Sequence, residues 1–450
     1  MVKSFLAATF VAAFILLSAV VPSLLVPSGA MADDALSLWE ISCIIRNDKF
    51  DYVLPGAMRR NKIDMWIVLD HGRGSEPLKR DFGIETAYGG GIYIFSDRGG
   101  DRIERLVLGG GSDLAEACGA YDEYRGRREL RSIVEERDPK QIGLNFAANP
   151  DEGEGIRAAD GLSYSDYKYL VKELGEKYAE RFVTAQHLIA DFHGERVASE
   201  VVEFSKVGDI TRREIERAFS NEVITPGKTT HNDVARWLEE RREAMGLRRT
   251  WFPTVYTHLP DGGEIGGTER VIQRGDVLQI DWGLYRNNFA TDIKRFAYVL
   301  REGETEAPPG VIRAFEEAKK VREIIRKNVS SGRTGRVQLD ALKQIIRDAG
   351  YVYTERERAS DVPGIEVNVG MHAAGNVSHD VSAGLFEIYP ERTKYMVPPN
   401  LIISMEYIVF TPADEWDGGK IPVNIEENVL VTERGIEWLY PPQDRVIVIR

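Results

Sequence analysis

Cysteine is nearly absent from this chain of 450 residues, which contains only Cys43 and Cys118. Two thiols cannot by themselves supply the ligands of a cysteine-based structural metal site. In an oxidising compartment the two cysteines would be free to form a disulfide, and otherwise they would remain two buried thiols. The sequence alone leaves both alternatives open.

Basic residues are also in short supply. The chain has 58 Lys and Arg residues against 71 Asp and Glu residues, which gives a formal net charge of -13. A protein that binds nucleic acid needs a positive patch that neutralises phosphates. We therefore expect no nucleic-acid partner.

Long apolar runs are missing after residue 26, so we expect no membrane span in the mature chain. The first residues are the exception: residues 5–26 are mostly apolar, Lys3 precedes them and residues 30–32 read Ala-Met-Ala. This order is typical of a secretory signal peptide, here residues 1–32, cleaved before Asp33. A retained membrane anchor is the alternative, because the apolar run is nearly long enough to cross a bilayer. We expect a periplasmic or secreted protein that is free of the membrane after cleavage.

The length of the chain exceeds what one hydrophobic core usually holds, which predicts two domains. Residues 33–192 have the pattern of a mixed α/β domain, with apolar strand-like segments at 65–69, 91–95, 103–108 and 141–146 and helical runs between them. No chemical constellation stands out in this part. Residues 193–450 then form the second domain.

The second domain contains a weak internal repeat. Helical patterns at 197–218 and 232–245 are joined by a turn, and patterns at 309–328 and 337–349 are joined by a similar turn. Thr230 is the expected N-cap of one helix, and Gly246 and Gly350 end the second helix of each pair. Two such halves packed face to face would leave a site between their sheets. The alternative is that helical hairpins simply look alike.

A predicted hairpin follows the first half. Val277–Trp282 and residues 289–299 read as strands, and a turn centred between Arg286 and Asn287 would place Asp281 directly opposite Asp292. Opposed Cβ atoms lie roughly 4.5–5.5 Å apart, and two carboxylates at that distance destabilise a sheet. A hard cation between them is the simplest remedy.

Three further acidic or imidazole side chains fall in strand-like segments. His372 ends one such segment, and Glu406 lies inside the apolar run 401–410, where a buried carboxylate would need a partner. Glu426 and its neighbour Glu427 point to opposite faces of the next strand. Alternation along that strand does not choose between them.

These motifs resemble the pita-bread metallopeptidases, a family that includes methionine aminopeptidase, aminopeptidase P, prolidase and creatinase. The resemblance covers roughly residues 195–440 and rests on the motifs Ile280-Asp281-Trp282-Gly283, Thr291-Asp292-Ile293, Gly370-Met371-His372, Met405-Glu406 and Ile425-Glu426-Glu427. It implies an α/β (α+β) fold, with a creatinase/prolidase-like N-terminal domain at 33–192 and a pita-bread catalytic domain at 193–450. It also implies the metal ligands, which are Asp281, Asp292, His372, Glu406 and Glu426, and so selects Glu426 over Glu427.

The resemblance further implies the chemistry. Two divalent ions (Mn, Co, Fe or Zn) would be bridged by Asp292 and Glu426, and a hydroxide between the ions would attack the scissile carbonyl. His379, in the stretch MHAAGNVSHDV, would be the catalytic histidine beside the substrate. The alternative is a loop histidine bonded to Asp380. A homodimer is a further implication.

The sequence departs from the family upstream of the first ligand. Aminopeptidase P and prolidase carry a histidine near the position of Glu264, and His258 is the candidate to replace it as a substrate-binding residue. An arginine of those relatives is Asn424 here. The resemblance thus implies an exported metallopeptidase for short peptides, Xaa-Pro bonds among them. The alternative is a non-peptidase enzyme on the same scaffold, a lyase or amidinohydrolase acting on a small molecule. A non-enzymatic binding protein fits less well, because the ligands are retained.

Overall fold

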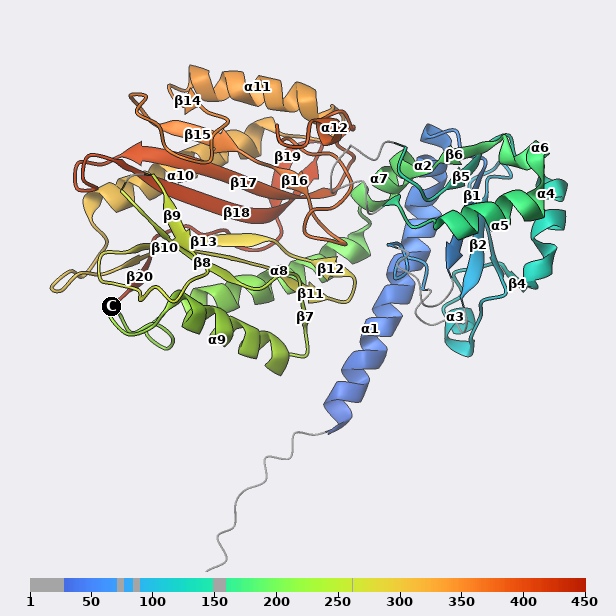
Figure 1. Cartoon of the computed structure of the whole chain (residues 1–450), viewed down its shortest axis with the longest axis horizontal. Helices are drawn as coiled ribbons and strands as arrows, with labels where there is room; N and C mark the ends of the chain where they lie inside the picture. Colours follow the sequence, from blue (N-terminus) through green and yellow to red (C-terminus); the bar gives the residue numbers. More distant parts are fainter. Residues whose placement is uncertain (1–27, 71–76, 84–89, 149–158, 261) are drawn as a thin grey trace, which may run out of the picture. The chain divides into compact units, whose positions relative to one another are not determined.

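The computed structural model describes residues 28–70, 77–83, 90–148, 159–260 and 262–450 (Figure 1). Most of the predicted signal peptide, residues 1–27, therefore lies outside the described part, and residues 28–32 belong to helix α1, Ser28–Asp48. Within these ranges no helix combines the length and the apolar character that crossing a membrane requires. The chain from Glu40 to Arg450 forms one unit by its contacts, and both large sheets lie in it. The predicted boundary between residues 192 and 193 stays a prediction.

The N-terminal part of that unit is built around a six-stranded sheet with the order β4-β3-β2-β1-β5-β6. After α1 its elements are η1 (Lys49–Val53), α2 (Leu54–Arg60), β1 (Met65–Asp70), β2 (Gly91–Ser96), β3 (Glu104–Leu108), α3 (Asp113–Ala117), β4 (Glu123–Arg125), η3 (Arg127–Glu129), α4 (Leu130–Arg137), β5 (Ile142–Leu144), α5 (Tyr164–Leu174), α6 (Glu176–Ala179), β6 (Phe182–Thr184) and α7 (Gln186–Gly194). Every residue of β1 is buried, because the strand is covered on both faces: Trp66 packs into one apolar cluster and Ile67 into the other.

One covalent link ties this region together. The structure joins Cys43 of α1 to Cys118, which follows α3, in a disulfide with Cα atoms 5.3 Å apart. The sequence left a disulfide and two free thiols as alternatives, and the structure has the disulfide.

The C-terminal part contains an eleven-stranded sheet whose main path is β14-β15-β17-β18-β13-β10-β8-β9. Its elements are α8 (Ala198–Ala218), α9 (His231–Ala244), β7 (Arg248–Arg249), β8 (Thr254–His258), β9 (Glu264–Gly266), β10 (Val277–Trp282), β11 (Leu284–Arg286), β12 (Phe289–Ala290), β13 (Ile293–Val299), α10 (Pro309–Asn328), α11 (Gly335–Asp348), β14 (Val352–Tyr353), β15 (Glu366–Val369), β16 (His372–Ala373), α12 (Pro390–Thr393), β17 (Leu401–Pro412), β18 (Lys420–Thr432), β19 (Gly435–Trp438) and β20 (Ile447–Ile449). The expectation of a site between two sheets is wrong in this respect, because the two repeat halves share one sheet that is continuous across β13 and β18.

The helical pairs of the repeat form as the sequence predicts. Thr230 caps α9: its Oγ accepts a hydrogen bond from the backbone N–H of Asp233 at 3.1 Å, and the Asp233 carboxylate accepts one from the backbone N–H of Thr230 at 2.8 Å. Gly246 and Gly350 follow α9 and α11 with φ values of 65° and 91°, a backbone region that favours glycine. Helices α8 and α9 therefore pair with each other, as do α10 and α11 (Figure 1).

The two long strands β17 and β18 separate a buried core from the face that carries the acids. Most of their odd-numbered residues, among them Met405 and Ile425, belong to one apolar cluster with Phe315 of α10. Because side chains alternate along a strand, Glu406 and Glu426 point to the opposite face, away from α10.

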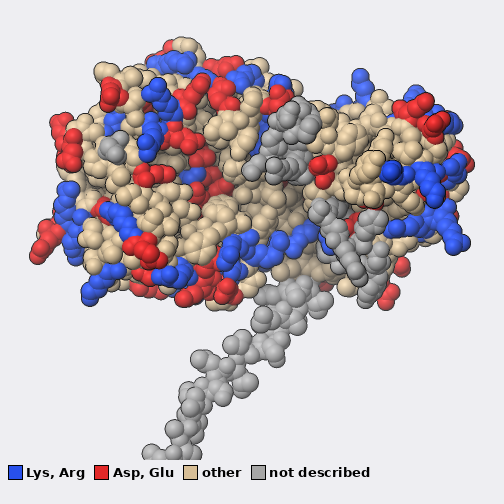
Figure 2. Space-filling model, in the orientation of Figure 1, with Lys and Arg blue, Asp and Glu red and all other residues tan. Residues whose placement is uncertain are grey.

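Charged side chains on the surface are largely paired locally. Acidic and basic residues are intermingled on the face shown in Figure 2. On helix α8, for example, Arg212 forms ion pairs with Asp209 at 2.6 Å and Glu216 at 2.9 Å, three and four residues away. The expectation of no nucleic-acid partner stays a prediction.

Candidate metal centre

The register of β10 and β13 differs from the predicted one. The turn is centred between Asn287 and Asn288, with Asn287 at a φ of 54°, so Arg286 pairs with Phe289. Asp281 therefore lies opposite Lys294. The predicted pairing of Asp281 with Asp292 is wrong by two residues, because the turn was centred one residue too early. A shift of two keeps a side chain on the same face of a strand, so the carboxylates still converge.

Neighbouring strands extend this pairing into a row. Lys294 of β13 lies opposite Glu426 of β18, and Glu426 lies opposite Glu406 of β17. Asp281, Lys294, Glu426 and Glu406 thus follow one another across four adjacent strands. His372 enters from β16, where it pairs with Ser404.

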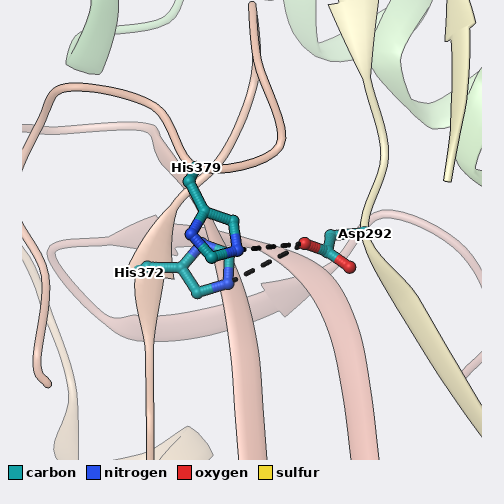
Figure 3. Close-up of side chains that lie close together, drawn as sticks. All are labelled: Asp292, His372 and His379. Carbon is teal, nitrogen blue, oxygen red and sulfur yellow. Dashed lines mark ion pairs between the residues drawn. The ribbon is translucent and has the colours of Figure 1, made fainter. Parts of the chain in front are cut away.

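The five predicted ligands come together in this place. Three groups have ligand atoms within 4.8 Å of one another, and they are Asp281 with Asp292 and Glu426, His372 with Glu406 and Glu426, and Asp292 with His372 and His379. The Nε2 atom of His372 lies 3.3 Å from Glu426 Oε1 and 3.9 Å from Asp292 Oδ2. Figure 3 shows both imidazole rings directed at the Asp292 carboxylate, with His379 Nε2 at 3.6 Å.

The donor set fits a divalent ion. It consists of carboxylate oxygens and imidazole nitrogen without sulfur, which suits Mn²⁺, Fe²⁺, Co²⁺ or Zn²⁺. In the described part of the chain, the buried atoms His372 Nε2 and Asp281 Oδ1 have no hydrogen-bond partner. Buried polar atoms are normally satisfied, so these two point to a ligand that the protein itself does not supply.

Burial and mutual repulsion perturb the acids of the site. Burial, with the charges of Glu426 and Glu406, raises the pKa of Asp281 to about 7 against the attraction of Lys294. The pKa of Asp292 is likewise raised by burial and by its acidic neighbours. The pKa of Glu426 is lowered despite burial, because Lys294 and His372 stabilise its carboxylate. Acids forced this close together hold their charge only beside a cation.

A second layer of hydrogen bonds fixes the ligands. The Asn428 side chain accepts a bond from the backbone N–H of Asp292 at 2.9 Å and donates one to Ser404 Oγ at 3.2 Å. The Ser404 hydroxyl in turn donates to Glu426. Such contacts orient carboxylates before a metal binds.

Glu427, the neighbour of Glu426, serves a different role. It points to the other face, where its carboxylate lies 2.9 Å from Arg295 Nη2 and accepts a bond from the backbone N–H of Gln443 at 2.9 Å. The structure therefore places Glu426 in the acidic row and Glu427 in a closed ion pair.

His258 does not join the ligand groups. It is buried on β8, with Nε2 3.1 Å from Gln279 Oε1, and burial lowers its pKa to about 4. It lines a cavity of about 370 Å³ together with Glu264 and Asn424. Asn424 stands two residues from Glu426 on the same strand, so the cavity adjoins the acids on one face of the sheet.

Lys294 is a residue of this site that was not among the predicted ones. Its ammonium contacts Glu406, lies 2.8 Å from Glu426 Oε2 and 3.6 Å from Asp281 Oδ2. The signal was available, since residues two apart on a strand share a face and Lys294 follows Asp292 by two.

A buried group behind His379 was also overlooked. Asp380 lies 2.9 Å from His193 and 2.8 Å from Arg196, residues far away in the sequence. Asp380 is therefore held by buried cations and not by His379, contrary to the alternative reading of that histidine as a partner of Asp380.

The chain is similar to known metallopeptidases in sequence and in fold. Residues 203–433 match the model of metallopeptidase family M24. The Xaa-Pro dipeptidase of Pyrococcus furiosus is 25% identical over 288 residues, which cover 62% of this chain and 71% of that protein. An X-Pro aminopeptidase structure from Thermotoga maritima aligns with a TM-score of 0.60 at 18% identity, covering 87% of this chain and 99% of that one. An Xaa-Pro dipeptidase from Bacillus anthracis aligns with a TM-score of 0.59 at 17% identity, covering 90% and 99%.

The family model covers slightly more than half of the chain, and the aligned structures share its fold along most of its length. The predicted fold class and the predicted resemblance to pita-bread enzymes are confirmed. The chain belongs to metallopeptidase family M24.

Proposed function

We propose that this protein is a metal-dependent peptidase that hydrolyses short peptides, with Xaa-Pro bonds among its substrates. The observation that carries the proposal is the convergence of Asp281, Asp292, His372, Glu406 and Glu426 from five separate segments onto one face of the sheet. The names of the relatives in Pyrococcus furiosus and Thermotoga maritima support the Xaa-Pro assignment.

A divalent ion in this centre would polarise the scissile carbonyl and lower the pKa of a water molecule. His372 and the two carboxylates that it faces, Asp292 and Glu426, would hold it, and Asp281 and Glu406 belong to the neighbouring candidate groups. The ammonium of Lys294 contacts the carboxylates of Asp281, Glu406 and Glu426. It therefore affects how many metal ions these carboxylates can bind.

His379 is the residue that we assign to the substrate. Its side chain is 42% exposed, while Nε2 faces Asp292. Burial of the ring, together with His372, lowers its pKa to about 3, so the imidazole is neutral at neutral pH. A neutral imidazole still offers one N–H donor. We assign that donor to the oxygen on which negative charge develops when the peptide carbonyl is attacked.

The cavity beside the acids sets the size of the substrate. At about 370 Å³ it lies at the small end of ligand pockets. His258, Glu264, Arg358 and Asn424 supply its polar contacts. A short peptide fits this volume better than a folded protein.

The same cavity favours one competing function. The family histidine upstream of Asp281 would fall near Glu264, and Glu357 and Arg358 line the cavity with Glu264. A more strongly charged pocket accords with a lyase or amidinohydrolase that acts on a charged small molecule.

A digestion experiment separates the two functions. Protein stripped of metal is incubated with a library of short peptides, with and without added Mn²⁺, Co²⁺, Fe²⁺ or Zn²⁺. We expect cleavage only with metal and enriched at Xaa-Pro bonds. No cleavage with any of these ions would overturn the peptidase proposal, and metal-dependent turnover of a charged small molecule would then establish the competing function.

We also propose that the protein is exported. The Cys43–Cys118 disulfide supports this, because such bonds persist in oxidising compartments. The N-terminus of protein recovered from the periplasm or medium should be Asp33. Recovery of the uncleaved chain from the cytoplasm alone would contradict export.

A further inference from the structure

Lys294 occupies a central position in the acidic row. Its backbone pairs with Asp281 on one side and with Glu426 on the other, and Glu406 follows on the next strand. Adjacent strands lie about 4.8 Å apart, so a side chain from the middle of the row reaches the carboxylates on both sides. The register of the sheet, and not a flexible loop, places a lysine there.

The side-chain contacts follow from this register. Lys294 is only 9% exposed, and its Nζ atom contacts Glu406, Glu426 Oε2 and Asp281 Oδ2, the last two at 2.8 and 3.6 Å. A divalent ion bound to these oxygens would lie next to the ammonium group, and the two positive charges would repel each other. The ammonium and such an ion therefore compete for the same carboxylates.

Charge alone does not fix the number of ions. Asp281, Asp292, Glu406 and Glu426 carry four negative charges when ionised, and Lys294 carries one positive charge. The net charge of three negative units lies between the charge that one divalent ion neutralises and the charge that two neutralise. Position decides, because among the described residues the ammonium forms its ion pairs with Asp281, Glu406 and Glu426 and not with Asp292.

The other side of the cluster is open to an ion. His372 Nε2 is buried without a hydrogen-bond partner in the described part of the chain, 3.3 Å from Glu426 Oε1 and 3.9 Å from Asp292 Oδ2. Ligand atoms bound to one ion at about 2.1 Å lie roughly 3–3.5 Å apart. The His372–Glu426 distance is already in this range, and Asp292 would have to move slightly towards His372. Glu426 would thus offer one oxygen to the ion and the other to Lys294.

We propose that the centre binds one divalent ion, held by Asp292, His372 and Glu426 with His379 beside them, and that the Lys294 ammonium replaces the second ion among Asp281, Glu406 and Glu426. The proposal rests on the part of the proposed function that requires a bound metal, and it replaces the expectation of two ions with one. It does not depend on which substrate the enzyme cleaves.

The test is a metal count on the full chain. Purified protein is stripped of metal, titrated with Mn²⁺ by calorimetry, and analysed by elemental analysis and electron paramagnetic resonance. We expect one Mn²⁺ per chain with the hyperfine pattern of an isolated ion. Lys294→Met, which removes the charge at nearly the same volume, should bind two Mn²⁺ with the spectrum of an exchange-coupled pair. Lys294→Arg should still bind one.

Lys420→Met is the matched control. Lys420 is also a buried lysine of the eleven-stranded sheet and pairs with Glu366, remote from the acidic row. Its replacement should leave the count at one. Thermal unfolding in the absence of metal checks that each variant is folded.

Two Mn²⁺ in the wild type, or none at saturating metal, would overturn the proposal. So would a count that stays at one in folded Lys294→Met. The metal count is independent of peptide digestion. If the protein binds one ion and cleaves no peptide, this proposal stands and the peptidase assignment is removed. If it cleaves peptides and binds two ions, the peptidase assignment stands and this proposal is removed.

Discussion

Two buried clusters of charged side chains in this protein balance their charges differently. The metal centre sets four carboxylates against one ammonium, Lys294. The second cluster, here called the ion-pair cluster, sets three acids against three basic side chains, and its members are Asp81, Glu200, Asp380, Lys49, His193 and Arg196. Both are shielded from water, so burial alone would not tell them apart.

The pKa shifts show what the difference means. His193 and Arg196, together with the backbone N–H of Val381, lower the pKa of Asp380 although burial opposes this. In the metal centre the pKa of Asp281, Asp292 and Glu406 is raised by burial and by acidic neighbours. A cluster that closes its own charges stabilises the fold, whereas one left with excess negative charge requires a cation from outside.

Removing a carboxylate from the metal centre should have the largest effect. Asp292→Ala or Glu426→Ala takes away an ion ligand and one unit of repulsion at once. We expect kcat/KM to fall by more than about 10³-fold, or roughly 4 kcal/mol, together with loss of metal while the fold is retained. Activity assays, elemental analysis and circular dichroism measure the three quantities. Full activity in Asp292→Ala would end the proposed mechanism.

The same kind of change in the ion-pair cluster should act on stability. Asp380→Ala removes the carboxylate that His193 and Arg196 share and leaves His193 with Asp81 and Arg196 with Glu200. Breaking a buried pair in this way costs about 3–5 kcal/mol of unfolding free energy. Denaturant unfolding of metal-stripped protein measures this, and it should show no comparable loss for Asp292→Ala. Equal losses in the two variants would erase the distinction between the clusters.

His379→Ala should lower activity less than Asp292→Ala does, and it should not lower stability as Asp380→Ala does. It removes a side chain that faces Asp292 and that we assign to the substrate. We expect turnover to drop about 10²-fold while one equivalent of metal is retained. A variant that loses metal as readily as Asp292→Ala would make His379 a ligand and not a substrate contact.

The smallest expected effect is a pH dependence of stability. Burial opposes the charge on His193, but Asp380 and Asp81 raise its pKa to about 9 from an ordinary value of 6.5. The folded state thus binds the proton more tightly than the unfolded one, and the stability gained is fully present below pH 6.5 and lost as pH rises towards 9. We expect a fall on the order of 2 kcal/mol over that window. His193→Gln should flatten it, and an unchanged slope in that variant would assign the effect to another group.

Local pattern predicted most of the elements around the site. Thr230 as an N-cap and Gly246 and Gly350 as helix ends were readable because each depends on neighbours a few residues away. The hairpin of β10 and β13 was also readable, but its register was not, since two adjacent asparagines allow the turn to be centred in more than one way.

Long-range partners were beyond reach for a different reason. The Asp380 contacts to His193 and Arg196 join residues separated by more than 180 positions, and no local periodicity records them. The strand patterns singled out Asp281, Asp292, His372 and Glu406 as candidates, but only the family resemblance joined them into one set of candidate ligands and selected Glu426 over Glu427. Lys294 escaped because the resemblance directs attention to ligands and not to the cation among them.

The junction of β13 and β18 gives the bound ion a mechanical role as well as a chemical one. The two repeat halves meet where Lys294 pairs with Glu426, and Asp292 and Glu426 stand on opposite sides of that junction. An ion bound by both carboxylates would cross-link the two halves at the centre of the sheet. Removal of the ion by a chelator should therefore destabilise the centre of the eleven-stranded sheet before its edge strands. Amide hydrogen exchange would then become faster along β13 and β18.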